Sequence, residues 1–205
     1  MKGKTLSLVL ILGIIGIFVF VIGFTGGCNK FENKSNSSLR LVVITITGAS
    51  LEGELGSYTV FSDVITSSGS IINDIATATL RADLLNPQPI EIPTHYQNVI
   101  VDQIDVSYSR TDGLNVEGRD VPYSFSQKVN ETITAGGSLV LDFVIVQHNA
   151  KAESPLVELS NYPNQEHVLK MEVHITIHSR DTGGSRLAPA YGSISIWFGN
   201  FADDN

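Results

Sequence analysis

The sequence has a single cysteine, few basic residues and no local catalytic signature. Its 205 residues contain only Cys28, so no disulfide can form within the chain, and the fold must depend on an apolar core or on a metal. No nucleophile elbow G-x-S-x-G, zinc motif H-E-x-x-H, P-loop or dinucleotide fingerprint occurs. We therefore expect a protein that is not an enzyme and holds no cofactor. A Ser-His-Asp triad dispersed along the chain would leave no such signature.

Basic residues are scarce relative to acidic ones. Lys and Arg number 13 against 21 Asp and Glu, which gives a net charge of −8. An acidic surface repels phosphate backbones and anionic lipid headgroups, so the composition argues against nucleic-acid binding and against a polybasic membrane contact. Helical periodicity is missing as well, because no window combines a 3.6-residue apolar repeat with capping residues.

One long hydrophobic run stands at the N-terminus. Lys2 and Lys4 precede it, no charged residue occurs from Thr5 to Phe24, and Gly26 and Gly27 follow. A basic start, an apolar centre and small residues before a cleavage site form an export signal, which predicts that the rest of the chain lies outside the cytoplasm. At about 20 residues the run is also long enough to span a bilayer as an uncleaved anchor helix.

The end of this segment, Thr25-Gly26-Gly27-Cys28, resembles the signal of bacterial lipoproteins, although Thr25 stands where such signals usually carry an aliphatic residue. The resemblance implies that the thiol of Cys28 receives a diacylglyceryl group, that the chain is cut before it, and that the new amine is acylated, with palmitate as a typical chain. It implies a lipid anchor in the cell membrane or, because Asn29 and not Asp follows the cysteine, in the outer membrane. An uncut transmembrane anchor is the alternative.

These features predict three segments. Residues 1–27 form the export signal, and residues 28–38 comprise the lipidated cysteine and a flexible linker rich in Asn and Ser. Residues 39–203 form a single domain on the extracytoplasmic side.

The domain is dominated by period-two alternation of apolar and polar residues. In HVLKMEVHITIH (167–178), five apolar side chains point one way and polar ones the other, as in a half-buried antiparallel strand. Similar runs are found at 39–47, 72–84, 99–109, 138–147 and 193–198. With Gly- and Asn-containing turns between the runs, the pattern predicts an all-β fold, an antiparallel β-sandwich of the Ig-like or fibronectin-like type. A jelly roll or a small barrel is the alternative.

The alternation also predicts which side chains form the core. They are Leu141, Phe143, Leu169, Met171, Val173, Ile175, Ile194 and Ile196. The stretch from Val99 onward, with VSYSRTDG, GRDVPYSF and SISIWFGNFADD, resembles small bacterial lipoproteins of unassigned function.

Three groups of residues are candidates for a site. Oxygen-bearing side chains recur in a glycine-containing loop that suits calcium without matching the EF-hand spacing, namely Asp112, Asn115, Glu117 and Asp120. His174 and His178 share a strand face but lie about 13 Å apart, too far to bind one metal ion. Tyr191 and Trp197 could form a binding surface, because aromatic rings on a sheet face can stack on sugars or on a partner protein.

The sequence thus favours an envelope lipoprotein with a non-enzymatic domain that binds a protein or glycan partner or supports a larger surface assembly. An envelope hydrolase with a dispersed active site and a calcium-dependent adhesion module are the competing hypotheses.

Overall fold

The computed structural model describes residues 37–49, 55–85, 97–162 and 167–201. The chain divides into two compact units, Met1–Lys34 and Ser35–Asn205, and all described residues belong to the second. The expected signal at 1–27, Cys28 and most of the linker lie outside the described residues. Among the described residues no helix is both long enough and apolar enough to cross a membrane.

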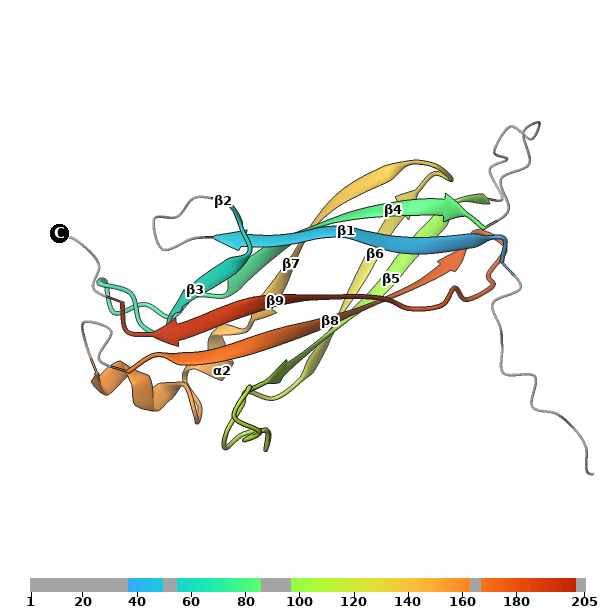
Figure 1. The fold of residues 1–205 in the computed structure, drawn as a ribbon. Coiled ribbons are helices and arrows are strands. Elements are labelled where there is room, and N and C mark those ends of the chain that lie inside the picture. The colour runs from blue at the N-terminus through green and yellow to red at the C-terminus, as the bar shows by residue number, and fades with distance from the viewer. Residues whose placement is uncertain (1–36, 50–54, 86–96, 163–166, 202–205) are drawn as a thin grey trace, which may run out of the picture. The chain divides into compact units, whose positions relative to one another are not determined.

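The described part of the chain is mostly β-strand (Figure 1). Its elements are β1 (Leu39–Ala49), β2 (Leu55–Ser57), β3 (Thr59–Asp63), β4 (Asp74–Leu84), β5 (Val99–Ser109), β6 (Phe125–Ile133), β7 (Ser138–Val146), the single-turn helix α2 (His148–Lys151), the 3₁₀ helix η2 (Val157–Asn161), β8 (Leu169–Asp181) and β9 (Ala190–Gly199). The all-β prediction is therefore confirmed.

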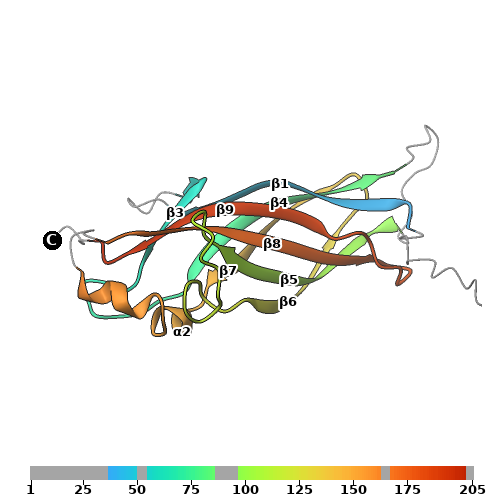
Figure 2. The same ribbon diagram turned by 60° about the horizontal axis from the view of Figure 1, so that its bottom comes forward.

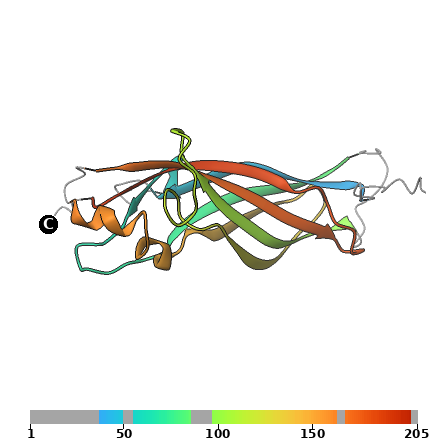
Figure 3. The ribbon, with the colours of Figure 1, turned by 90° about the horizontal axis from the view of Figure 1, so that it is seen from below.

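The strands form two sheets. Sheet A has the order β2-β1-β4-β7 and sheet B the order β3-β9-β8-β5-β6, and all neighbours are antiparallel except the parallel pair β3–β9. Figures 2 and 3 show the same strands from two further directions. One continuous cluster of buried apolar side chains contains residues from both sheets, so the two sheets share a single core.

The period-two pattern locates the core correctly. In β8, Met171, Val173 and Ile175 are at most 3% exposed, and Lys170 on the opposite face is exposed. The other predicted core residues are buried too, except Leu169, which is half-buried at the start of β8 and packs against the core. Alternation therefore predicted the inward faces of β7, β8 and β9.

Register shifts interrupt the alternation in two strands. In β1 the shift between Val43 and Thr45 changes the inward positions from odd to even numbers, so that Leu41 and Ile46 both face the core. In β5 the shift lies between Val101 and Gln103 and has the same effect. Both are bulge-like irregularities, which add a residue to one strand of a pair and bend it.

Two glycines allow β1 to approach β3 and β9 closely. A Cβ atom added at Gly48 would lie 2.3 Å from Val60, and one added at Gly192 would lie 2.4 Å from Ile46. A side chain at Gly48 would meet the stiff, branched side chain of Val60, whereas one at Gly192 would meet only the end of the Ile46 side chain, which can turn aside. Gly48 is therefore the position where a larger residue would most disturb the packing of β1 on β3.

Val173 provides a test of the shared core, because its side chain is fully buried between the sheets. Val173→Ala removes two methyl groups and leaves a cavity, which should lower the free energy of unfolding by about 1–3 kcal/mol. Val140→Ala is the matched control, since Val140 is 65% exposed and its truncation should change stability by no more than about 0.5 kcal/mol. Urea denaturation would measure both, and equal losses would contradict the core assignment.

Candidate binding site

A buried ion pair lies at one end of the domain. The ammonium of Lys151, whose side chain is 0% exposed, donates hydrogen bonds to the carboxylate of Asp74 and to the carbonyl of Asp63, both at 2.8 Å. Ser62 Oγ donates to the second carboxylate oxygen of Asp74 at 2.5 Å. Because a buried charge is costly without such partners, this cluster is a fixed and highly specific feature of the fold.

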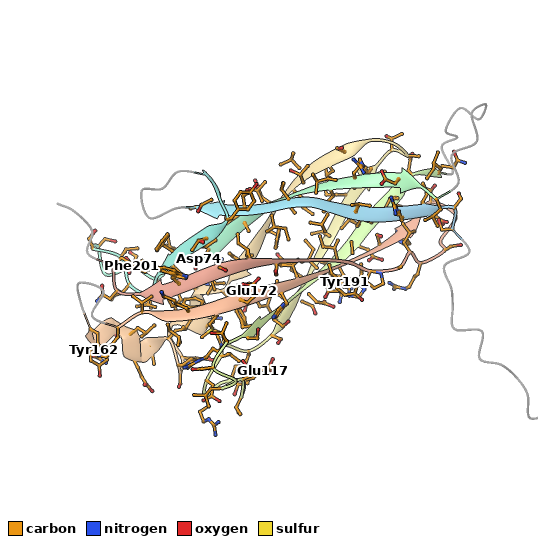
Figure 4. All side chains as sticks on the ribbon, viewed as in Figure 1. Asp74, Glu117, Tyr162, Glu172, Tyr191 and Phe201 are labelled. Carbon is orange, nitrogen blue, oxygen red and sulfur yellow. The ribbon has the colours of Figure 1, made fainter. Side chains whose placement is uncertain are left out.

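The cluster connects three parts of the chain. Asp74 begins β4 of sheet A, Ser62 and Asp63 end β3 of sheet B, and Lys151 ends α2 in the connection from β7 to β8. Figure 4 labels Asp74, which lies toward the same end of the domain as Phe201. One lysine side chain therefore links both sheets to the connection between them.

An open groove of about 440 Å³ lies directly beside this ion pair. Its apolar lining comes from Ala49, Val60, Phe61, Ile72 and Ile75, and its polar lining from Asp63, Asn73, Asp74, Thr77, Asp142 and Lys151. This volume lies within the range of about 300–1,000 Å³ typical of ligand sites, and an apolar pocket with a few convergent polar groups is the usual form of such a site.

The groove has unusual electrostatics. Burial raises the pKa of the Asp74 carboxyl, while the charge of Lys151 and the hydrogen bonds from Lys151 and Ser62 act in the opposite direction. Burial, together with the nearby charge of Asp74, also raises the pKa of Tyr108, whose hydroxyl donates to the carbonyl of Ile145 at 2.6 Å and so joins sheet B to sheet A. Perturbed titrating groups next to a pocket are typical of functional sites.

The predicted aromatic surface lies elsewhere, on the outer face of sheet B. Tyr191 is 71% exposed near the start of β9 (Figure 4). Trp197, at the other end of the strand, is half-buried because Phe61 packs edge-on against its ring at 5.3 Å and Lys170 Nζ lies 3.7 Å from the ring centroid. Of the two predicted side chains, Tyr191 is therefore the one that is largely accessible to a partner.

The same face of sheet B carries two separate histidine pairs. Ser109 Oγ and His174 Nε2 are 2.6 Å apart, and His178 Nε2 lies 2.7 Å from the carboxylate of Asp105. Although partial burial acts to raise the pKa of Asp105, hydrogen bonds from Ser126, Gln103 and His178 lower it overall. Among the described residues, the hydrogen bonds of His174 and His178 do not join a serine, a histidine and a carboxylate in one Ser-His-Asp chain.

The calcium candidates lie on the long loop between β5 and β6, which projects beyond the sheets (Figures 3 and 4, Glu117). Their oxygens accept hydrogen bonds within the loop: Asp112 pairs with Arg110, Asp120 with Arg119, and Glu117 with Ser124. Asn115 accepts from the backbone of Arg110 at 2.6 Å. Across the described ranges, no three His, Cys, Asp or Glu side chains are grouped so that they could hold a metal ion.

The groove was not anticipated from the sequence. Lys151 lies in the polar stretch QHNAKAES, which has the composition of an ordinary surface loop, and its partner Asp74 is 77 positions away. Ile72 and Ile75 fall within the strand run predicted at 72–84, and nothing in the run marks them for a separate role. The local signal is a pair of large aliphatic residues on either side of Asn73 and Asp74.

No protein-family model matches the chain, and no curated protein matches it. Among solved structures, the X-ray structure of Northeast Structural Genomics Consortium target SoR45 is similar over 83% of this chain and 95% of that chain, with 9% sequence identity and a TM-score of 0.34. A TM-score of this size does not establish a shared fold or a shared function.

Substitution of Lys151 tests the ion pair. Lys151→Ala leaves the carboxylate of Asp74 buried without its counter-charge, so we expect a loss of about 3–5 kcal/mol in the free energy of unfolding. The control is Lys170→Ala, an exposed lysine whose contact with Trp197 should contribute no more than about 1 kcal/mol. Chemical denaturation of both variants would show the difference, and similar losses would mean that the pair does not stabilise this end of the domain.

Proposed function

We propose that the protein is a membrane-tethered lipoprotein of the cell envelope whose β domain binds a partner and performs no catalysis. The tether is supported by the hydrophobic run from Thr5 to Phe24 and by Gly26-Gly27-Cys28 behind it. The domain would lie on the extracytoplasmic side, joined to its lipid anchor by the short polar linker.

The domain is proposed to be Ig-like. In that arrangement strands A, B and E lie in one sheet, and strands G, F, C and C′ lie in the other. The observed orders β1-β4-β7 and β9-β8-β5-β6 correspond to A-B-E and G-F-C-C′, in the same order along the chain. Domains of this architecture present loops and strand edges to partners, which supports a binding role.

The groove beside Lys151 and Asp74 is the observation that carries the binding function. Ile72 and Ile75 each remain 55% exposed at its rim, although exposing a large aliphatic side chain has a free-energy cost. A partner that covers both would recover this apolar area. The neighbouring ion pair fixes the ends of β3 and β4, so that the groove is already formed before a partner arrives, and such preorganisation reduces the entropic cost of binding.

The two competing functions have less support. A hydrolase would depend on a pair such as Ser109 and His174, to which no described carboxylate adds a third contact. Calcium-dependent adhesion through residues 112–120 would require the carboxylates of that loop to leave their arginine and serine partners.

Replacement of Cys28 tests the anchor. In wild-type protein we expect mass spectrometry to show a chain that starts at Cys28 with added lipid, because the cysteine thiol is the acceptor of the diacylglyceryl group. Cys28→Ala should accumulate as the uncut precursor, whereas the control Thr25→Leu, which improves the match to lipoprotein signals, should be processed normally. Wild-type protein that retains residues 1–27 would overturn the lipoprotein proposal in favour of a transmembrane anchor.

Capture from envelope extracts tests the binding function. The full chain in a non-ionic detergent should retain specific envelope proteins or glycans, and Ile75→Asp should abolish their capture because it places a charge in the apolar wall of the groove. Ile44→Asp is the matched control, since Ile44 is 45% exposed on β1 and does not line the groove. Capture that is equal in both variants would reject the groove. Hydrolytic turnover that is lost in Ser109→Ala or His174→Ala would instead favour the hydrolase.

A further inference from the structure

The charges that line the groove are unbalanced. Three carboxylates, those of Asp63, Asp74 and Asp142, line it, and the ammonium of Lys151 is the one positive side chain among the lining residues. That ammonium is fully buried and is already bound to Asp74 and to the carbonyl of Asp63. A ligand at the mouth of the groove therefore meets a negative potential that Lys151 offsets only in part.

Asp142 is the most accessible of these acids. Its side chain is exposed on β7, where it accepts one hydrogen bond from Thr77 Oγ1 across the β4–β7 pair at 2.6 Å. One hydrogen bond leaves most of the acceptor capacity of a carboxylate available. Asp142 can therefore accept a further hydrogen bond from a cationic group.

Apolar contact area lies next to this charge. Ile75 is on the β4 strand two residues before Thr77, and it lines the groove together with Ile72 and Phe61. Residues two apart on a strand lie on the same face, about 6.6 Å from each other, and side chains two positions apart in an extended peptide have the same spacing. The surface thus combines an apolar wall and an acceptor of positive charge at about the spacing of side chains two positions apart.

We infer that the groove binds an exposed, extended polypeptide segment in which an aliphatic side chain stands two positions from a Lys or Arg. This inference rests on the proposed binding function and names the chemistry of its partner. The aliphatic side chain covers Ile72 and Ile75, and the cation pairs with Asp142. The net charge of −8 on the whole chain adds long-range attraction for a basic partner, which raises the rate of association.

The position of the groove suits a partner that approaches from outside. Ala49, at the end of β1, lines the groove, whereas Leu39, where the chain enters the domain, is at the opposite end of the same strand. Figure 1 shows β1 running from the end where the described chain begins toward the end that holds β3 and α2. At about 3.3 Å per residue the two ends of β1 are about 33 Å apart, so Leu39 lies far from the groove.

Short labelled peptides provide the test. Three peptides on one Gly-Ser scaffold would carry Ile-Ser-Lys, Ile-Ser-Glu or Ser-Ser-Lys at the centre, and are called here the Ile-Lys, Ile-Glu and Ser-Lys peptides. Fluorescence anisotropy would measure their binding to the full chain in a non-ionic detergent. We expect the Ile-Lys peptide to bind at least about tenfold more tightly than either of the others, a difference of about 1.4 kcal/mol. Binding should weaken as salt is raised, because the contact includes an exposed charge pair.

Two lysine substitutions on the same strand separate the site from general electrostatics. Asp142→Lys should reduce binding of the Ile-Lys peptide at least about tenfold and should raise binding of the Ile-Glu peptide, which a merely unfolded variant would not do. Val140→Lys places a lysine on the same face of β7, about 6.6 Å away and outside the groove lining. It adds one positive charge, whereas Asp142→Lys changes the charge by two, and it should leave the order of the peptides unchanged.

The remaining outcomes would overturn the inference. Equal affinity for the Ile-Lys and Ile-Glu peptides, with envelope capture still lost in Ile75→Asp, would reject a cationic partner but keep the groove as the site of the proposed function. Capture that survives Ile75→Asp would reject both. Concentration-dependent self-association that Asp142→Lys abolishes would identify a second copy of this chain as the occupant and would reject a separate protein partner.

Discussion

At one end of the domain, the arrangement of the strand ends depends on a single buried ammonium group, that of Lys151. The side chain of Lys151 has no exposed surface, and it holds the end of β3, the start of β4 and the helix α2 together through hydrogen bonds of 2.8 Å. Removing either charged partner would leave the other buried and unpaired, which costs more than the pair contributes when it is intact. The ends of the two sheets are therefore fixed in relation to one another, and the groove between them has a fixed shape.

The rest of the domain is held by apolar packing, and here the sequence was informative. The alternation in 167–178 predicted that Met171, Val173 and Ile175 face inward, and the run at 99–109 coincides with β5. A pattern of period two identifies a strand when one face meets the core and the other meets water. It gives no information about which strands are neighbours, because pairing is decided by contacts between distant segments.

The strands that were missed have physical reasons for lacking the pattern. β6 is an edge strand whose side chains are mostly exposed or half-buried, so FSQKVNETI shows little contrast between its faces. β2 and β3 are only 3 and 5 residues long, too short for a periodic signal.

The groove could not be predicted from the sequence for a different reason. Lys151 and Asp74 meet only in the folded chain, and no local spacing relates them. The calcium candidates were suggested by a local spacing that the fold uses differently. The spacing of oxygen-bearing side chains did not reveal that arginine and serine side chains already hydrogen-bond to those oxygens.

The antiparallel ladder between β1 and β4 has a mechanical consequence. It extends from Leu39 opposite Leu84 to Gly48 opposite Ala76, between the N-terminal end of the domain and the end that carries the groove. If the chain is held at Leu39 while a partner pulls at the groove, the force acts along these strands. The hydrogen bonds of the ladder are then loaded together in shear and not opened one after another. A domain loaded in this direction resists extension far better than one peeled from an edge.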